Sequence, residues 1–375
     1  MKIMKKHHIT GVLALLAAVA ISAYANDIFM LERELEPLYP SQYLSEVKML
    51  SDYLPTLKDT PGDTEIYIYR GEKTGGSCLV LGATHANEIG GYMGAVVLME
   101  NAKATQGTLY IIPRANRSGL TSTDPGDAAP SRIHVSTPSG VRWFKYGSRA
   151  TNPMDQWPDP DVYIHASSRQ NLSGSEVRNL NRAYPGRPDG NFTERVAYAI
   201  AELIRQERID MTIDLHEASP EYPNNNSTVA HENAMQIAAL GMINMQMQGI
   251  DIKLEPSPAN LHGLSHRELG DYTNTFALLM ETPNAAQGRT RGATNERLAV
   301  TGQDKCYEIL VKYDLLYVPY DENGHPLEER VGRHVQGVRE YVAAMSQFYP
   351  EKTVVIENIP TYDDFMNGAL GDYLH

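Results

Sequence analysis

The sequence predicts an α/β fold: a mixed, largely parallel central sheet with helices on both faces. From residue 65 onward, strand-like apolar runs alternate with helical patterns, the order that builds helix-covered sheets. Two runs, 78–81 and 276–280, are continuously apolar, which is typical of strands buried on both faces. Hydrophobic residues make up 42% and charged residues 21% of the chain, the ordinary composition of a folded globular protein.

The first 25 residues predict an export signal. Three lysines lie within the first six residues, an apolar run covers 11–21, and an Ala-Tyr-Ala cleavage pattern ends at Ala25. The apolar run is short for a bilayer span, and no later run approaches about 20 apolar residues. We therefore expect a signal peptide at 1–25, no membrane span in the mature chain, and a periplasmic or secreted protein.

The rest of the chain is expected to form a catalytic domain at 26–350 and a C-terminal tail at 351–375. Residues 29–55 begin with a helical pattern and then become irregular. Strands are predicted at 64–69, 78–81 and 107–113. Residues 114–178 are rich in Ser, Pro and Gly, so we expect a long loop that forms a lid or a wall of a site.

The second half of the domain continues the alternation. Asn191 and Glu194 predict a capped helix start. The elements expected after it are a strand at 209–215, a Pro/Asn-rich loop at 219–228, a Met-rich helix at 232–248, strands at 250–254 and 275–280, helices at 294–312 and 327–347, and a strand at 353–356 within the tail.

Charge and cysteine content narrow the function classes. The net charge of −13 argues against a nucleic-acid partner, because affinity for phosphate backbones depends on Lys and Arg. Cys78 and Cys306 are the two cysteines. Oxidising compartments permit a bridge between them, but the position of Cys78 in a core strand favours a buried free thiol. Nothing in the sequence indicates the oligomeric state.

The most informative residues are His85 and Glu88, which directly follow the strand at 78–81. Gly82 is expected to let the backbone turn sharply there. An imidazole and a carboxylate three residues apart can chelate one ion, and zinc hydrolases commonly use two His and one Glu. The third candidate is His216, at the end of the strand at 209–215. A second His-x-x-Glu at 325–328 lies in a polar, loop-like stretch, and we interpret it as chance.

Four motifs in order resemble those of the zinc carboxypeptidase superfamily, which includes metallocarboxypeptidases and the succinylglutamate desuccinylase/aspartoacylase branch. Residues 82–88, Gly-Ala-Thr-His-Ala-Asn-Glu, resemble its zinc motif. Residues 179–186, Asn-Leu-Asn-Arg-Ala-Tyr-Pro-Gly, resemble its substrate motif. The segments 214–216 and 280–282 resemble its third-ligand and catalytic-glutamate strands. Asn179 replaces the family's usual Asp, and Ala86 stands where Gly is common.

The resemblance implies a role for each matching residue. His85, Glu88 and His216 would hold one zinc ion per chain, and Glu281 would be the general base. Asn181 and Arg182 would grip a substrate carboxylate. An upstream arginine would steady the developing oxyanion; Arg169 and Arg178 compete for this role, and we favour Arg169.

The predicted function is an exported zinc hydrolase that cleaves an amide bond next to a free carboxylate. A carboxypeptidase acting on small peptides is the first expectation, with cell-wall peptide fragments as a hypothesis motivated by the export signal. An N-acyl amino acid deacylase is the second. A different class, a catalytically inactive protein that binds carboxylates, remains the third, although the intact ligand set with Glu281 argues against it.

Overall fold

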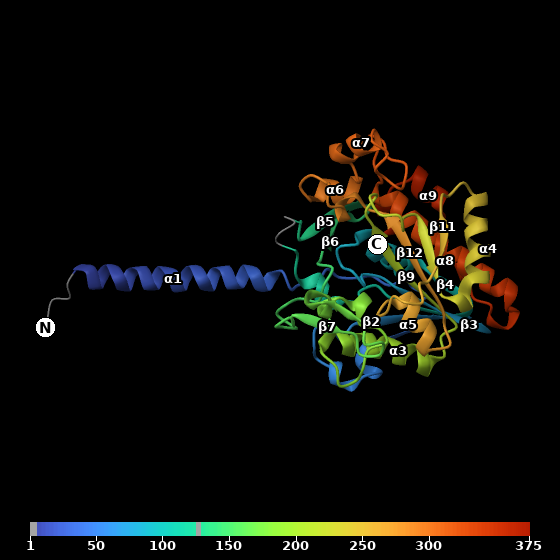
Figure 1. Cartoon of the computed structure of the whole chain (residues 1–375), viewed down its shortest axis with the longest axis horizontal. Coiled ribbons are helices and arrows are strands. Elements are labelled where there is room, and N and C mark those ends of the chain that lie inside the picture. The colour runs from blue at the N-terminus through green and yellow to red at the C-terminus, as the bar shows by residue number, and fades with distance from the viewer. Residues whose placement is uncertain (1–5, 125–128) are drawn as a thin grey trace.

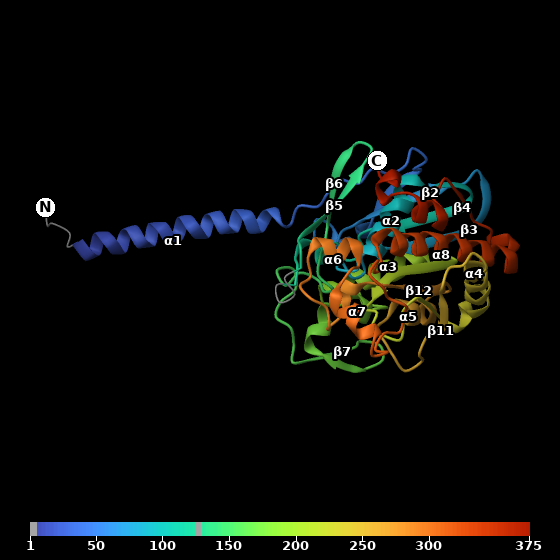
Figure 2. The same cartoon turned by 90° about the horizontal axis from the view of Figure 1, so that it is seen from above.

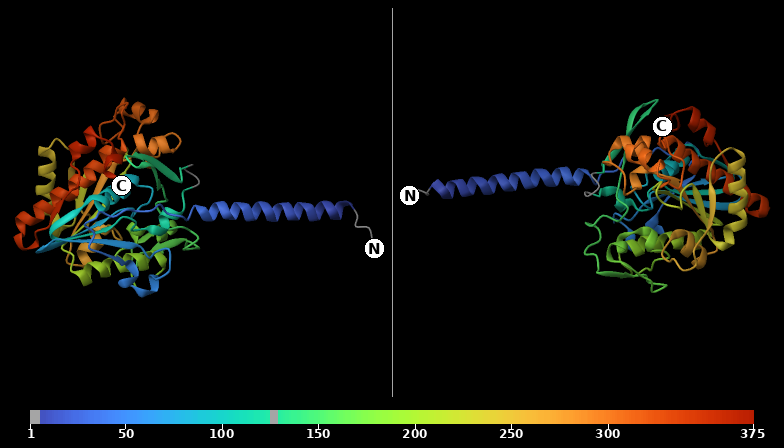
Figure 3. Two further views of the ribbon diagram at one scale, coloured as in Figure 1. Left: turned by 180° about the vertical axis from the view of Figure 1, so that it is seen from behind. Right: turned by 45° about the horizontal axis from the view of Figure 1, so that its top comes forward.

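The computed structural model describes residues 6–124 and 129–375. An α/β body holds most of them, and one long helix, α1 (Lys6–Leu31), projects away from it (Figure 1). The projection is equally plain from behind and from a tilted view (Figure 3). Two lysines of the predicted signal peptide, Lys2 and Lys5, lie outside the described residues.

The body is organised around a nine-stranded sheet with the strand order β1-β2-β4-β3-β9-β12-β10-β11, while β13 pairs with β4. The four central strands, β4, β3, β9 and β12, run parallel to one another. Antiparallel pairs flank them, β2 beside β4 and β10 beside β12. This confirms the predicted mixed sheet with a parallel centre. The strands span β1 Glu46–Met49, β2 Glu65–Arg70, β3 Lys73–Leu81, β4 Lys103–Ile112, β9 Met211–Ala218, β10 Ser227–Ala230, β11 Lys253–Pro256, β12 Phe276–Pro283 and β13 Val355–Glu357.

Helices cover both faces of the sheet, as predicted. Alternate residues of the central strands point into two separate hydrophobic clusters, because side chains of a strand alternate between faces. The larger cluster contains α2 (Ile89–Asn101), α4 (Met235–Met247) and α8 (Leu327–Phe348). The smaller contains α3 (Phe192–Glu207) and part of α5 (Ser265–Tyr272).

Helix α1 is longer than the apolar run seen in the sequence. It is apolar from His8 to Leu31, and by length and composition it is the one helix in the described residues that could cross a membrane. The helix continues beyond Ala25 because Ile28, Phe29, Met30 and Leu31 extend the apolar stretch. An apolar helix near the N-terminus is compatible with a signal sequence, and cleavage after Ala25 stays a prediction.

Three segments differ from the sequence-based expectation. The helical pattern from residue 29 ends at Leu31, and prolines at 37 and 40 precede strand β1. The expected helix at 294–312 is two helices, α6 (Glu296–Thr301) and α7 (Lys305–Val311), because Gly302 adopts φ 64° and Asp304 caps a new start. The described part of 114–178 contains two hairpins, β5–β6 (Arg132–Thr137, Gly140–Lys145) and β7–β8 (Val162–Ile164, Asn171–Ser173).

The C-terminal segment is part of the body rather than a separate tail. Strand β13 extends the sheet by pairing with β4. Helix α9 (Tyr362–Asn367) and the turn after it bury Phe365, Leu370 and Leu374 in the larger hydrophobic cluster. The β5–β6 hairpin stands beside this C-terminal end (Figure 2). Cys78 and Cys306 are free thiols, and Cys78 is buried as expected.

Candidate active site

The candidate residues come from the carboxyl ends of three adjacent parallel strands. His85 and Glu88 follow β3, and Glu88 directly precedes α2. His216 lies on β9, and Glu281 lies opposite it on β12 in the strand register. Because neighbouring strands are ~4.8 Å apart, this register places the two side chains together. Open α/β sheets build their sites at this edge.

The turn that carries His85 depends on two small residues. Gly82 is needed for space: a Cβ there would lie 2.6 Å from the Ala95 Cβ and 2.9 Å from the Pro113 carbonyl oxygen. The residue with a left-handed backbone in this turn is Ala83, with φ 51°. A non-glycine residue in this region is strained, and such strain concentrates at functional sites.

His85, Glu88 and His216 meet in a buried cluster. The Nδ1 of His85 lies 2.7 Å from Oε1 of Glu88, and the Nδ1 of His216 lies 2.8 Å from Oε2 of the same carboxylate. The two rings are perpendicular, with centroids 4.7 Å apart. One donor atom from each residue thus lies within 4.8 Å of the other two.

Each imidazole is held from behind by an acceptor. The Nε2 of His85 lies 2.8 Å from Oδ1 of Asn179. The Nε2 of His216 lies 2.9 Å from Oδ2 of Asp214, whose Oδ1 accepts a hydrogen bond from Thr84. The hydrogen bond to Asn179 favours the tautomer of His85 in which Nδ1 carries a lone pair. At His216 the Asp214 carboxylate makes a close charge contact with Nε2 without completing a hydrogen bond. Asp214 lies two residues before His216 on the same strand face, and the two side chains are in contact.

These donors fit a divalent cation. Two Nδ1 lone pairs facing one carboxylate at 2.7 and 2.8 Å repel it unless a proton or a cation lies between them. Two imidazoles and a carboxylate form a common zinc ligand set. The residues therefore match the chemistry of the group that the sequence motifs imply.

The electrostatics of the cluster set its protonation. Burial and the nearby Arg149 lower the pKa of His85 to about 4. Burial opposes protonation of His216 as well, but Asp214 and Glu88 raise its pKa well above the ordinary value. Without a cation, the proton of the cluster therefore belongs to His216.

Glu281 differs from the other carboxylates. It borders the open cavity, yet its Oε2 is shielded from solvent and has no hydrogen-bond partner among the described residues. Burial and the negative charge of Glu88 raise its pKa to about 8. A carboxyl group tuned towards neutral pH beside a candidate metal cluster has the property of a general acid–base group.

Asn181 and Arg182 line the same cavity. Asn181 is buried, and its Oδ1 accepts a hydrogen bond from the Ser265 backbone over 2.8 Å. Arg182 donates to the Asn181 carbonyl and lies 3.9 Å from a Glu176 carboxylate oxygen. Burial and the neighbouring Arg149 lower the pKa of Arg182, so two guanidinium groups lie close enough to repel each other.

The arginine that reaches the cluster is Arg149, which the sequence did not single out. Its Nη1 lies 3.1 Å from Oε1 of Glu88. By contrast, Arg169 is exposed and is not among the residues lining the cavity. Arg178 is paired with Asp159, with its Nε 2.7 Å from Oδ1. The geometry therefore favours Arg149 for the role for which Arg169 and Arg178 were considered.

A backbone contact positions Arg149 beside the ligand cluster. Gly147 donates to the Ala86 carbonyl, and the Ala86 N–H donates to the Ser148 carbonyl, over 3.0 and 3.2 Å. A Cβ on Gly147 would lie 2.5 Å from the Cβ of Ala86. The segment before Arg149 is thus fastened to the loop of His85, a pairing across 61 residues that local sequence patterns do not reveal.

A buried ion pair supports the cluster from below. The Arg330 Nη1 lies 2.7 Å from Oε1 of Glu217, and both side chains are fully buried. The Oε2 of Glu217 accepts hydrogen bonds from the Gly90 N–H and from the Asn284 side chain. The backbone N–H of Glu217 donates to the Glu88 carboxylate. This network links β9, α2, α8 and the end of β12.

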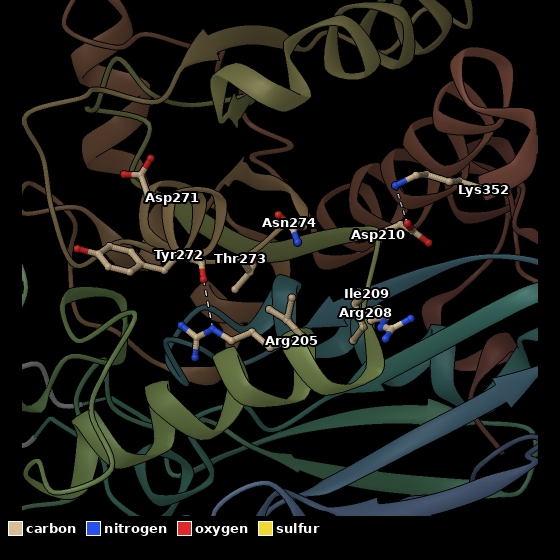
Figure 4. Close-up of a pocket in the computed structure, with 10 residues that line it drawn as sticks. Arg205, Arg208, Ile209, Asp210, Asp271, Tyr272, Thr273, Asn274 and Lys352 are labelled. Carbon is tan, nitrogen blue, oxygen red and sulfur yellow. Dashed lines mark hydrogen bonds and ion pairs between the residues drawn. The ribbon is translucent and has the colours of Figure 1, made fainter.

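Five of the candidate residues line a cavity of about 670 Å³: His85, Glu88, Asn181, Arg182 and Glu281. Its polar lining includes His85, Glu88, Arg149, Arg182 and Glu281, which is enough space for a small peptide or an acylated amino acid. A second cavity of about 610 Å³ lies at the opposite, amino-terminal ends of β9 and β12 (Figure 4). Its charged groups include the Lys352–Asp210 pair, and none of the candidate residues lines it.

Comparisons with known proteins find similarity in structure only. No family model matches the sequence, and no curated protein matches it. A succinylglutamate desuccinylase from a Silicibacter species is 15% identical, with a TM-score of 0.40 over 75% of this chain and 60% of its own. The chain therefore spans less than two thirds of that protein.

Two further solved structures resemble the fold. A metallo-carboxypeptidase from Burkholderia cenocepacia is 11% identical, with a TM-score of 0.42 over 80% of this chain and 68% of its own. The cell shape determinant protein Csd4 from Helicobacter pylori is 9% identical, with a TM-score of 0.45 over 81% and 59%. Both branches named from the sequence motifs are thus represented.

Proposed function

We propose that this protein is a zinc-dependent hydrolase that cleaves an amide bond next to a free carboxylate, with carboxypeptidase activity on small peptides as its main reaction. The observation that carries the proposal is the buried cluster of His85, Glu88 and His216, with Glu281 opposite His216 in the strand register and on the wall of the same cavity as His85 and Glu88. Such a reaction needs zinc ligands, a carboxyl group whose pKa lies near neutral pH, and guanidinium groups.

Glu281 is the proton carrier in this proposal. Zinc held by His85, Glu88 and His216 would polarise the scissile carbonyl and acidify a water molecule. Glu281 takes the proton from the attacking water and passes it to the nitrogen of the leaving group. Burial and Glu88 raise the pKa of Glu281 to about 8 in the metal-free protein; a dication held by His85, Glu88 and His216 would lower it and so favour the carboxylate, the form that acts as a base.

The two guanidinium groups bind different negative charges of the substrate: its free carboxylate and the charge that develops on the carbonyl oxygen. Arg182 and Asn181 bind the free carboxylate, since a planar guanidinium can hold it through two hydrogen bonds. Arg149, which lies nearer the ligand cluster, stabilises the negative charge that develops on the carbonyl oxygen during attack. A neutral amide at the substrate terminus would offer Arg182 no negative charge to bind.

The site of action proposed is outside the cytoplasm. Helix α1 has the apolar character and N-terminal position of a signal sequence. The test is N-terminal sequencing of protein recovered from the culture medium and from the periplasmic and membrane fractions. A chain starting at Asn26 outside the membrane fraction supports export with cleavage, whereas an intact chain in the membrane fraction contradicts it.

The activity is tested with zinc-loaded protein on a panel of blocked dipeptides. Release of the C-terminal amino acid supports the proposal. Release of acetate or succinate from acylated amino acids, without peptide cleavage, would assign the protein to the deacylases instead. The variant Glu281→Gln separates enzyme from binding protein: turnover should fall by orders of magnitude with zinc retained, whereas a binding protein would hold its ligand unchanged.

A further inference from the structure

The segment that follows α1 contacts both ends of the loop that carries the candidate oxyanion arginine. We name residues 145–155 the arginine loop. The Oε2 of Glu32 lies 2.9 Å from Nζ of Lys145, at the start of the loop. The Nη2 of Arg33 lies 2.7 Å from Oδ1 of Asp155, at its end. Two consecutive residues thus hold both ends of one loop, and the inner end of α1 lies beside the β5–β6 hairpin in two perpendicular views (Figure 1 and Figure 2).

The ion pair at the start of the loop contains a buried lysine. The side chain of Lys145 is 2% exposed, and Glu32 is its one charged partner in the part of the chain that the structure describes. Burial raises the pKa of Glu32, but the hydrogen bond and charge of Lys145, together with Arg132, outweigh burial and lower the pKa below its ordinary value. A buried ammonium group needs such a carboxylate, because an unpaired buried charge is costly.

The ion pair at the end of the loop is also shielded from water. The side chain of Asp155 is 8% exposed, and its second oxygen accepts a hydrogen bond from the Ser118 hydroxyl over 2.5 Å. The same hydroxyl accepts from the Asn152 N–H of the loop over 3.1 Å. Arg33 therefore contacts a carboxylate that is already held in place, which restricts the position of the loop more than a solvated surface pair would.

A third residue fixes the segment itself to the body. Glu36 is buried, its carboxylate accepts a hydrogen bond from the Tyr92 hydroxyl, and its backbone carbonyl accepts one from Arg114. Tyr92 lies on α2, one turn after Glu88. Residues 32–36, which we name the strap, are thus anchored to the helix that begins at a candidate metal ligand.

The side chain of Arg149 itself is loosely enclosed. It is 42% exposed, and its one ion pair within the described ranges 6–124 and 129–375 is the 3.1 Å contact with Glu88. A long, exposed side chain loses rotamer freedom when it is held in one place, so its position depends on the backbone beneath it. Misplacement of a group by about 1 Å can lower turnover about 100-fold.

We propose that the strap positions Arg149 for catalysis, with Glu32 and Arg33 as positioning residues that act through the two ends of the arginine loop. The inference rests on the proposed function, because it takes Arg149 as the donor to the developing oxyanion. A strap that served stability alone would change the free energy of unfolding without changing kcat.

The experiment uses the variants Lys145→Met and Arg33→Met in the full chain. Methionine removes each ion pair while an unbranched side chain still fills the space. Each variant should lower kcat about tenfold, with KM changed less than about twofold, because the substrate carboxylate is bound by other residues. The matched control Lys352→Met removes a lysine ion pair of 2.7 Å at the opposite end of the sheet and should leave kcat unchanged.

A double-mutant cycle identifies the route by which the strap acts. In an Arg149→Ala background, Lys145→Met and Arg33→Met should lower kcat no further, because the group that the strap positions is absent. The same tenfold loss with and without Arg149 would show that the strap does not act through this residue, and the inference would be wrong.

Hydrogen exchange of the arginine loop gives a readout without turnover. In zinc-loaded protein the amides of 145–155 should exchange about tenfold faster in both variants than in wild type or Lys352→Met, because the loop opens locally more often. Unchanged exchange, or faster exchange with the kcat of wild type, overturns the inference and leaves the proposed function intact. If wild type cleaves no amide substrate, the proposed function fails, and exchange alone decides whether the strap holds the loop.

Discussion

Asn179 and His85 are joined by a hydrogen bond of 2.8 Å between Oδ1 and Nε2. The orientation of the amide is fixed independently, because Oδ1 also accepts from the Asn181 N–H and Nδ2 donates to Glu176. An amide oxygen can only accept, so Nε2 of His85 donates and its Nδ1 faces Glu88 with a free lone pair. A residue of the substrate motif thus orients a ligand of the metal motif.

The first prediction follows from this contact. Asn179→Ala should weaken zinc binding about 10- to 100-fold, the usual cost of losing a group that orients a metal-bound histidine. Asn179→Asp should bind zinc at least as well as wild type, because a carboxylate is a stronger acceptor. The measurement is competition against a chromophoric chelator. Equal zinc affinity of the Ala variant would show that Asn179 does not orient the ring.

Zinc binding should release a proton from His216. Asp214 and Glu88 raise its pKa in the metal-free protein, whereas the lowered pKa of His85 leaves that ring neutral. Because a ligating Nδ1 must be unprotonated, zinc affinity should rise with pH, by up to about tenfold per pH unit, in the range where His216 is protonated in the metal-free protein. Glu281→Gln is the suitable background, since Glu281 would otherwise add its own proton.

The control for this pH dependence is Asp214→Asn in the same background. It removes the carboxylate that raises the pKa of His216, so the slope against pH should flatten and fewer protons should be released. Calorimetry in buffers of different ionisation enthalpy counts those protons directly. If zinc affinity hardly changes with pH in the protein that retains Asp214, the protonation assigned to His216 is wrong.

Arg149 should matter for the chemical step, and Arg169 should not. Arg149→Ala should lower kcat about 10²- to 10³-fold, as removal of an oxyanion donor does elsewhere. Arg169→Ala, at an exposed position outside the cavity, should leave kcat within a factor of about two. Steady-state kinetics on the best dipeptide provide the comparison. The reverse order of effects would restore Arg169 to the role first predicted for it.

Arg182→Ala should act on carboxylate recognition. The kcat/KM for a substrate with a free C-terminus should fall roughly 10- to 100-fold. This corresponds to a loss of about 1.5–3 kcal/mol of binding free energy, the range for hydrogen bonds to a charged group. The same substrate with an amidated C-terminus should be cleaved poorly by both proteins and to the same degree. An equal loss on both substrates would contradict the assigned clamp.

The buried ion pair of Arg330 with Glu217 should carry stability. Arg330→Met leaves a fully buried carboxylate without its cation and should lower the free energy of unfolding by about 3–5 kcal/mol. Arg339→Met on the same helix removes a hydrogen bond to the Ile359 carbonyl and should cost about 1 kcal/mol. Urea denaturation of the metal-free proteins measures both, and equal costs would contradict the role of the pair.

The predictable parts of the fold are those that a short stretch of sequence determines. Continuous apolar runs marked the central strands, and the capping pair of Asn191 and Glu194 marked the start of α3. The candidate ligands were recognisable because each directly follows or ends such a run. In each case a local pattern determines a local structure.

The missed features depend on contacts between distant segments. Arg149 reaches Glu88 only because Gly147 pairs with the backbone of Ala86. A strand was predicted at 353–356, but its pairing with β4, which joins the C-terminal segment to the sheet, was not. Glu217 and Arg330 are ordinary charged residues in sequence, and their burial becomes visible only when β9 packs against α8. Hydrophobic periodicity contains no information on these pairings.

The most direct test of the account is the zinc content of purified protein, measured by mass spectrometry for wild type, His85→Ala and the matched surface variant His134→Ala. We expect one zinc ion per chain in wild type and His134→Ala, and loss of zinc in His85→Ala with the fold retained by circular dichroism. Zinc absent from wild type after reconstitution, or retained in full by His85→Ala, would contradict the assignment of the metal centre.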